Sequence, residues 1–181
     1  FNLVGQVHDG WRVAGATLAG ERQMVAGSGS GGVDRIGGSG ADRLLATYRE
    51  LCIDHPVTRD HLMRLHAEEH IRQSTNARVR ATVKAGGTPG PAASIGKVHQ
   101  GRLNQQLQLA ACELSGMEAI AWEGDWLDDM PYATKGMIRS RANTIEGGTT
   151  EVNKNVLGEK VLGLPREPDP YRGVAWKETP R

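Results

Sequence analysis

The sequence is poor in cysteine and aromatic residues and has no long apolar run. Its 181 residues include one phenylalanine and two cysteines, Cys52 and Cys112, which fall in apparently helical segments without paired spacing. This spacing argues against a disulfide framework and indicates reduced thiols packed as small buried hydrophobes. No apolar stretch approaches the roughly 18 residues of a membrane span, and no charged-then-apolar leader opens the chain. We therefore expect an unsecreted, cytoplasmic protein.

The charge balance argues against two further classes of partner. Lysine and arginine total 22 against 21 aspartates and glutamates, so the formal net charge is +1. A chain this close to neutrality has no electrostatic reason to bind nucleic acid or an anionic membrane surface. Its length and composition are those of an ordinary globular domain, so its function must come from local sites.

Helical spacing dominates the chain. The expected helices cover residues 10–26, 40–53, 58–85, 92–116, 134–144 and 149–162. Asp9 can cap the first helix and Gly27 can end it. The glycine- and serine-rich stretch 27–40 predicts a loop, because ordering it as a helix would cost much entropy and bury little. Period-two alternation is absent beyond the first few residues, so the predicted fold class is all-α, a long-helix up-and-down bundle.

Two of these helices carry apolar stripes. In the helix expected at 58–85, the residues spaced for one buried face are Leu62, Leu65, Ile71, Val79 and Val83. In the first helix, the residues on one stripe are Trp11, Ala14, Leu18 and Val25. A stripe of this kind predicts the side of the helix that packs against the core.

Glu21 lies near the flank of the stripe on the first helix. A carboxylate facing the core would have a raised pKa, as a general acid or base needs near neutral pH. The alternative is that Glu21 lies at the edge of the stripe and contacts solvent or a basic side chain. Arg22 lies on the other flank and does not face Glu21 as an i, i+4 partner would, so it can bind an anionic or carbonyl group.

A second candidate site is the stretch SRANTIEGGTTEV at residues 140–152. Gly147 and Gly148 allow close approach to the backbone, and Thr149 can cap the helix that follows. The N–H groups and dipole at such a helix start favour a phosphate. Many Gly-Gly-Thr turns only connect helices, so this pattern alone leaves both interpretations open.

Two runs resemble a known family. Residues 140–165, SRANTIEGGTTEVNKNVLGEKVLGLP, resemble the C-terminal signature of acyl-CoA dehydrogenases, and so do residues 5–22, GQVHDGWRVAGATLAGER. The order of helices between them, and the segment around Ser94, Lys97 and Gly116, are also similar to this family, in a branch frequent in actinobacteria. The resemblance implies the C-terminal helical domain of an FAD-dependent enzyme that converts an acyl-CoA thioester to an enoyl-CoA.

The chain opens with Phe1 rather than methionine, which indicates a piece cut from a longer protein. The resemblance then implies that residues 1–8 end a preceding β domain, 9–163 form the helical bundle and 164–181 form an extended tail. The N-terminal helical domain and the middle β domain of the family are missing, so this chain alone should not bind FAD tightly.

The resemblance also implies roles for particular residues. Glu21 matches one of two family positions for the base that removes the α proton, while Gly147 occupies the other, which leaves Glu146 as the reserve candidate. Gly147 N–H and Arg22 are implied in substrate binding. The positions that match contacts to the FAD diphosphate or ribose, across a subunit interface, are Gly148, Thr149 and Glu151. The family context further implies a homo- or hetero-oligomer built as a dimer of dimers, and an electron-transfer flavoprotein as acceptor.

One departure supports an alternative function. The family's arginine followed by Phe-Gly, which binds the flavin diphosphate of a neighbouring subunit, is replaced here by the sequence of residues 53–59, although Arg59 could substitute. A non-catalytic helical scaffold of the same ancestry, supporting a catalytic partner, therefore remains the second hypothesis.

Two further motifs are set aside. Gly27, Gly29 and Gly32 satisfy G-x-G-x-x-G, but a helix rather than a strand precedes them. His66 and His70 have the H-x-x-E-H spacing of some zinc peptidases, which an exposed helix rich in histidine and glutamate explains more simply. We expect no metal site.

Overall fold

The computed structural model describes residues 3–27, 40–87, 90, 94–126 and 128–180, without the side chains of residues 19–27 and Trp176. Every regular element in these ranges is a helix, so the predicted all-α class is confirmed. The α-helices are α1 (Gly10–Gly27), α3 (Ala41–Glu50), α4 (Pro56–Lys84), α5 (Ser94–Ser115), α6 (Tyr132–Ser140) and α7 (Thr150–Lys160). Short 3-10 helices are η2 (Gly116–Ala119), η3 (Arg141–Thr144) and η4 (Trp176–Glu178). None of the described helices is long and apolar enough to cross a membrane.

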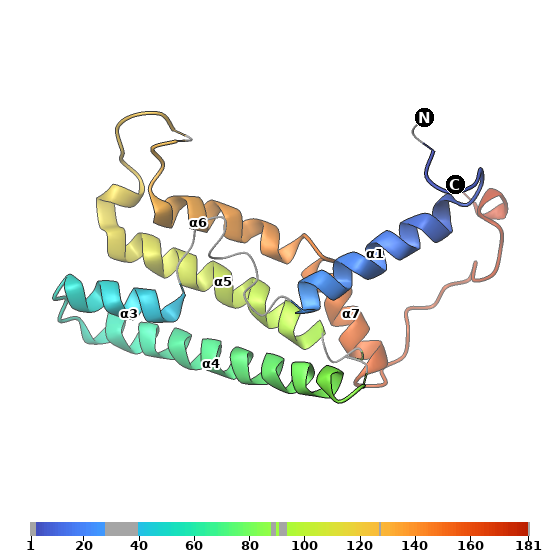
Figure 1. Cartoon of the computed structure of the whole chain (residues 1–181), viewed down its shortest axis with the longest axis horizontal. Coiled ribbons are helices and arrows are strands. Elements are labelled where there is room, and N and C mark those ends of the chain that lie inside the picture. The colour runs from blue at the N-terminus through green and yellow to red at the C-terminus, as the bar shows by residue number, and fades with distance from the viewer. Residues whose placement is uncertain (1–2, 28–39, 88–89, 91–93, 127, 181) are drawn as a thin grey trace.

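Helix α5 is the centre of the bundle. It contacts α1, α3, α4, α6 and α7, and Figure 1 shows it running lengthwise between α4 and α6. Leu103 and Leu107 of α5 are at most 4% exposed and pack with Leu62 and Leu65 of α4. The remaining members of this core are alanines of α3, α5 and α6 together with Leu44. Small side chains let the helices approach closely, while the leucines bury most of the apolar surface.

Several helix boundaries differ from the prediction; for example, α3 ends at Glu50 rather than at residue 53. Helix α4 begins at Pro56 rather than at residue 58, because His55 Nδ1 accepts from Thr58 N–H at 3.3 Å and proline suits the first helical position. The helix expected over 134–144 is α6 followed by the tighter turn of η3. Helix α7 ends at Lys160 rather than at residue 162.

The prediction of which α4 residues are buried was only partly right. Leu62 and Leu65 are buried, but Ile71 is 60% exposed and Val83 is 47% exposed. One row of buried or half-buried residues follows α4 at intervals of three or four residues and contains polar as well as apolar side chains: Thr58, Leu62, Leu65, Glu69, Arg72, Asn76 and Val79. Ile71 and Val83 are off this row, because hydrophobicity alone does not show which residues face α3 and α5.

The described side chains of the α1 stripe, Trp11, Ala14 and Leu18, are exposed rather than packed against the core. Trp11 is 91% exposed and Leu18 is 48% exposed. Helix α1 contacts α5, but its N-terminal half projects away from the bundle in Figure 1, so none of the described helices covers the stripe there. Asp9 precedes the helix, and its carboxylate accepts from Arg12 Nε at 2.8 Å.

Cys52 is exposed, so the prediction that both cysteines are buried was wrong for this one. It follows the C-terminal end of α3 with φ +50°, and its N–H donates to the carbonyl oxygen of Arg49 at 3.1 Å. A residue in this left-handed conformation ends a helix and turns the chain outward.

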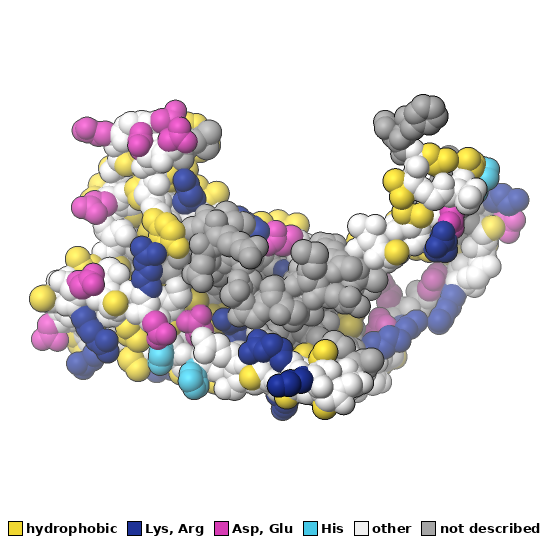
Figure 2. Space-filling model, in the orientation of Figure 1, with side chains coloured by type: hydrophobic (Ala, Val, Ile, Leu, Met, Phe, Trp, Pro, Cys, Tyr) yellow, Lys and Arg dark blue, Asp and Glu magenta, His cyan; other side chains and the backbone are white. Residues whose placement is uncertain are grey.

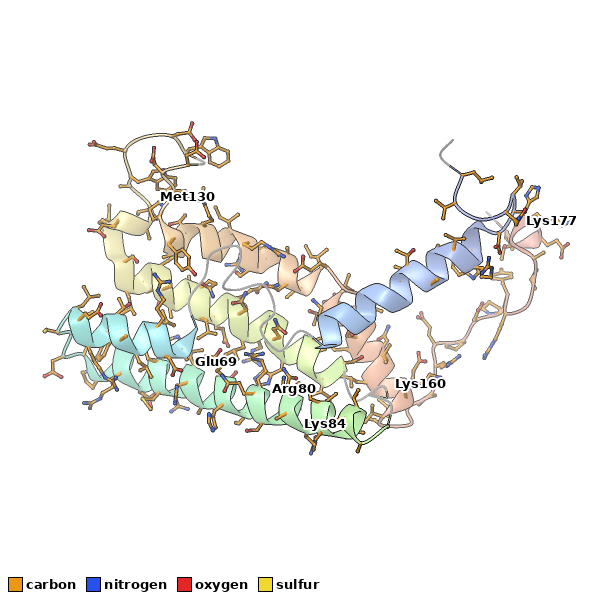
Figure 3. All side chains as sticks on the ribbon, in the orientation of Figure 1. Glu69, Arg80, Lys84, Met130, Lys160 and Lys177 are labelled. Atoms are coloured by element: carbon orange, nitrogen blue, oxygen red, sulfur yellow. The ribbon has the colours of Figure 1, made fainter. Side chains whose placement is uncertain are left out.

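Glu69 of α4 caps the N-terminus of α3, although the two are far apart in the sequence. One of its carboxylate oxygens accepts from the backbone N–H of Ala41 at 2.8 Å, and the other lies 3.5 Å from Arg72 Nη2. Figure 3 shows Glu69 on the side of α4 turned toward α3 and α5. A carboxylate at a helix start satisfies an unpaired N–H and interacts well with the helix dipole.

We expect Glu69→Ala to lower the free energy of unfolding by about 1–3 kcal/mol, as for the loss of a helix cap or a hydrogen bond to a charged group. Glu69→Gln keeps an acceptor oxygen and should cost clearly less. Urea unfolding followed by circular dichroism measures both. Equal losses for the two variants would contradict a capping role for the side-chain oxygen.

Candidate functional site

The Gly-Gly-Thr turn has the backbone geometry of a helix start open to a ligand. Gly147 and Gly148 have φ values of +63° and +88°, which glycine adopts without strain. Thr149 is the N-cap of α7, and its hydroxyl accepts from Val152 N–H at 3.2 Å. Asn153 Nδ2 donates to the carbonyl oxygens of Gly148 and Thr149, both at 3.0 Å. The turn is therefore tied down from its own helix, and a Cβ at Gly148 would lie 3.1 Å from Asn153 Nδ2.

This geometry fits a phosphate group. The first N–H groups of an α-helix have no partner within the helix, and the helix dipole adds positive potential at the same point. The two glycines keep side chains away from that end of α7. Glu151 lies exposed in the first turn of α7. Because its carboxylate is negatively charged, it is better suited to accept a hydrogen bond from a neutral hydroxyl group of a ligand than to contact a phosphate.

The Glu146 carboxylate is held by neighbouring side chains. Arg139 Nη2 donates to its two oxygens at 2.8 and 2.9 Å, and Asn143 Nδ2 donates to one of them at 3.1 Å. The side chain is 42% exposed. Two side chains therefore hold this carboxylate through three hydrogen bonds, and this geometry favours an anchoring role for Glu146.

A row of polar residues on α5 was not predicted from the sequence. Lys97, Gly101, Asn104 and Gln108 follow one another at helical spacing and face η3 or its neighbours in the core. Asn104 Nδ2 donates to Asn143 Oδ1 at 2.5 Å, and Lys97 Nζ donates to the backbone oxygen of Asn143. Polar residues at i, i+7 and i+11 on a helix with buried leucines were the available signal.

The remaining candidate residues lie on α1 and α4. Glu21 and Arg22 are in the C-terminal half of α1, but their side chains lie outside the described part of the chain, so their roles stay predictions. Helices α1 and α7 both contact α5, which places the two candidate-bearing segments on one supporting helix. Arg59 is exposed in the first turn of α4.

Each of the two motifs set aside has at least one residue on a helix. Helix α1 runs through Gly27, while Gly29 and Gly32 lie outside the described residues. His66 and His70 stack with ring centroids 6.4 Å apart, and His66 Nδ1 lies 3.4 Å from an oxygen of Asp42. Within the described ranges, no three or more His, Cys, Asp or Glu side chains are grouped to hold a metal ion.

Acidic side chains gather on the loop between η2 and α6, visible as the magenta cluster at the upper left of Figure 2. Asp129 accepts from the backbone N–H of Asp125 at 2.8 Å, and Asp125 accepts from that of Asp128 at 3.1 Å. These carboxylates therefore brace the loop that carries them.

The thiol of Cys112 has a raised pKa, first because of partial burial and then because of the nearby Glu113 carboxylate, with a hydrogen bond to Thr134 acting the other way. A raised pKa lowers the thiolate fraction near neutral pH, roughly tenfold per pKa unit.

We expect Cys112 in a Cys52→Ser variant to react with iodoacetamide more slowly than Cys52 in a Cys112→Ser variant. The reaction rate of Cys112 should still rise above the pH at which an ordinary thiol is fully ionised. Mass spectrometry of timed samples measures both rates, and equal rates would contradict this expectation.

The fold and the turn together define an all-helical domain with a Gly-Gly-Thr turn at a helix N-terminus. A family model described as "Acyl-CoA dehydrogenase, C-terminal domain" matches residues 8–162. The chain therefore belongs to the acyl-CoA dehydrogenase family and contains its C-terminal domain.

Relatives in sequence are mycobacterial. The chain is 30% identical over 165 residues to acyl-CoA dehydrogenase IpdE1 of Mycolicibacterium smegmatis, covering 91% of this chain and 39% of that protein. It is also 30% identical over 164 residues to acyl-CoA dehydrogenase FadE34 of Mycobacterium tuberculosis, covering 91% of this chain and 21% of that protein. The chain thus spans well under half the length of these relatives.

A solved structure shares the fold. The protein titled "Tcur3481-Tcur3483 steroid ACAD" aligns with a TM-score of 0.70 at 21% identity, covering 91% of this chain and 42% of that one. At this level of identity the likeness concerns the arrangement of helices.

Proposed function

We propose that this chain is the C-terminal helical part of an FAD-dependent acyl-CoA dehydrogenase that converts an acyl-CoA thioester to the α,β-unsaturated enoyl-CoA. The observation that carries the proposal is the family match over residues 8–162, which includes the turn at Gly147–Thr149. The geometry of that turn supports the proposal, because two glycines and a capped helix start suit the diphosphate of FAD.

In the proposed mechanism the chain moves one proton and stabilises one developing charge. Glu21 removes the α proton of the thioester, and bound FAD would supply the hydride acceptor for the β carbon. Gly147 N–H polarises the thioester carbonyl, since α protons are weakly acidic and the enolate oxygen needs a preorganised donor. Arg22 assists in placing the substrate, while Gly148, Thr149 and Glu151 hold the diphosphate or ribose of FAD. Glu146 is the reserve candidate for the base.

The assembly is proposed from the family resemblance. Residues 1–8 would end a preceding β domain, 9–163 would form the helical domain and 164–181 a C-terminal tail. The whole protein would be a cytoplasmic homo- or hetero-oligomer, a dimer of dimers in which the turn contacts flavin across a subunit interface. An electron-transfer flavoprotein would reoxidise it.

A second candidate function is a non-catalytic scaffold of the same ancestry. The observation in its favour is the absence of the family's Arg-Phe-Gly motif, in whose place stand residues 53–59. Arg59 lies near this position and is exposed, so it is available to substitute in flavin binding.

The test uses the full-length protein purified with its flavin. Under anaerobic conditions, straight-chain, branched and steroid-derived acyl-CoAs are added in turn, and the visible absorbance of FAD is followed. The proposed function predicts rapid bleaching by at least one of these classes. A protein that binds no flavin would support the scaffold, and a flavoprotein that no acyl-CoA bleaches would contradict the dehydrogenase.

A further inference from the structure

The polar row of α5 is costly to bury and needs a reason. Gln108 is completely buried, and Asn104 is 8% exposed, although they are neighbours of Leu103 and Leu107 in the core. Burying an amide costs free energy unless its hydrogen bonds are made inside the protein. Leucine at these positions would bury more apolar area, so the amides are better explained by what they hold than by what they contribute to the core.

These amides form a chain of hydrogen bonds that runs in one direction. Gln108 Nε2 donates to Asn104 Oδ1 at 2.8 Å, and Asn104 Nδ2 donates to Asn143 Oδ1 at 2.5 Å. Asn143 Nδ2 then donates to Glu146 Oε1 at 3.1 Å. Each amide donates toward the next, and a carboxylate, which only accepts, ends the chain. Hydrogen bonds aligned in this way polarise one another, so the chain is more rigid than its separate links.

Asn143 is the residue of η3 through which this chain of hydrogen bonds is attached to the backbone. Besides its two side-chain bonds, its backbone oxygen accepts from Lys97 Nζ. Gly101 lets η3 approach α5, since a Cβ there would lie 3.1 Å from the backbone oxygen of Asn143 and 3.3 Å from Thr144 Cγ2. Gln105 Nε2 adds a bond to Thr144 Oγ1 at 3.3 Å. The segment just before the turn is therefore held on α5 through both backbone and side chains.

We infer that Asn143 is a positioning residue, which fixes the Gly147–Thr149 turn relative to α5, and that Glu146 is its anchor rather than a base. Asn143 precedes Gly147 by four residues, and Glu146 directly precedes Gly147. A shift of Asn143 or of Glu146 therefore moves the N–H donor of Gly147. The inference rests on the proposed function, because it assigns this turn a ligand that must be placed accurately. A displacement of about 1 Å can slow a reaction about 10²-fold.

The test compares matched variants of the full-length flavoprotein. Asn143→Ala removes the attachment at η3, and Asn155→Ala makes the same change at an exposed position of α7. Glu146→Ala removes the anchor, whereas Glu146→Gln keeps one acceptor oxygen, equivalent to the Oε1 that accepts from both Arg139 and Asn143. Circular dichroism checks folding, flavin content checks FAD binding, and anaerobic bleaching gives the rate constant at saturating acyl-CoA together with the concentration that gives half of it.

We expect Asn143→Ala and Glu146→Ala each to lower the saturating rate constant about 10²-fold. The half-saturating acyl-CoA concentration should change much less, because the donor at Gly147 is proposed to act mainly on the charge that develops during the reaction. Glu146→Gln should recover most of the rate lost in Glu146→Ala. The double Ala variant should be little slower than either single one, since both changes break the same link. Asn155→Ala should bleach like the wild type.

Two outcomes would overturn the inference. One is an Asn143→Ala protein that folds and bleaches at the wild-type rate. The other is a Glu146→Gln protein as slow as Glu146→Ala, which would make Glu146 the base. If Asn143→Ala does not fold, the two Glu146 variants decide by themselves. A wild-type protein that is not bleached contradicts the proposed function instead, and this is seen before any variant is compared.

Discussion

In the full-length protein, Glu21→Gln should abolish bleaching of the flavin by acyl-CoA while FAD remains bound. The glutamine amide has nearly the shape of the carboxylate but cannot take the α proton. Loss of a general base typically slows a reaction about 10²- to 10⁴-fold, and a weakly acidic C–H bond places this case toward the upper end. Anaerobic stopped-flow absorbance measures the rate, and the flavin-to-protein ratio shows whether the cofactor is retained.

The matched control for this prediction is Glu118→Gln, the same change at an exposed residue of η2. It should leave bleaching unchanged. Rapid bleaching by the Glu21→Gln protein would rule out Glu21 as the base. If Glu146→Gln then stopped the reaction, the base would be Glu146, and the anchoring role inferred for that residue would be wrong as well.

The largest effect on stability is expected from Leu103→Ala in the middle of α5. Leu103 is 1% exposed and packs against α3 and α4 in the core. Removing its side chain leaves a cavity that helices packed on several sides cannot close, at a cost of about 2–5 kcal/mol. For a chain of this size that corresponds to a fall in Tm of roughly 2–4 °C per kcal/mol. Urea and thermal unfolding followed by circular dichroism measure the loss.

Leu109→Ala is the control, because it makes the same change on the same helix where the side chain is 47% exposed. It should cost about 0.5 kcal/mol or less, as is usual for surface positions. Equal losses at the two positions would contradict the assignment of Leu103 to the core, because alanine has the higher helix propensity and propensity alone would not lower stability.

Local chemistry explains why most helices could be predicted. Proline and glycine bound the segments, and the 3.6-residue spacing of apolar residues needs only the chain itself to be recognised. The start of α4 was placed two residues late because the capping action of a histidine, His55, is not a common signal. The Gly147–Thr149 turn was found for the same local reason, since two glycines before a threonine describe both its backbone and its cap.

The environment of a side chain depends on neighbouring helices and could not be predicted from local spacing. The face of α4 that is buried includes Glu69, because a carboxylate there meets the open N–H of Ala41 at the start of α3. Trp11 is hydrophobic and yet exposed, because α1 projects beyond the bundle in Figure 1. Neither residue type shows its environment, which is set by helices far away in the chain.

The all-α class, the order of the helices and, through the two signature runs, the family could all be predicted from the residues alone. Each of these follows from short-range spacing or from local motifs. The packed bundle was needed to reveal that Asn104 and Lys97 of α5 hold Asn143, 39 and 46 residues later, and that Glu146 is bound by Arg139. Hydrogen bonds between distant segments depend on how the helices pack, and that packing is a property of the whole bundle rather than of any one stretch of it.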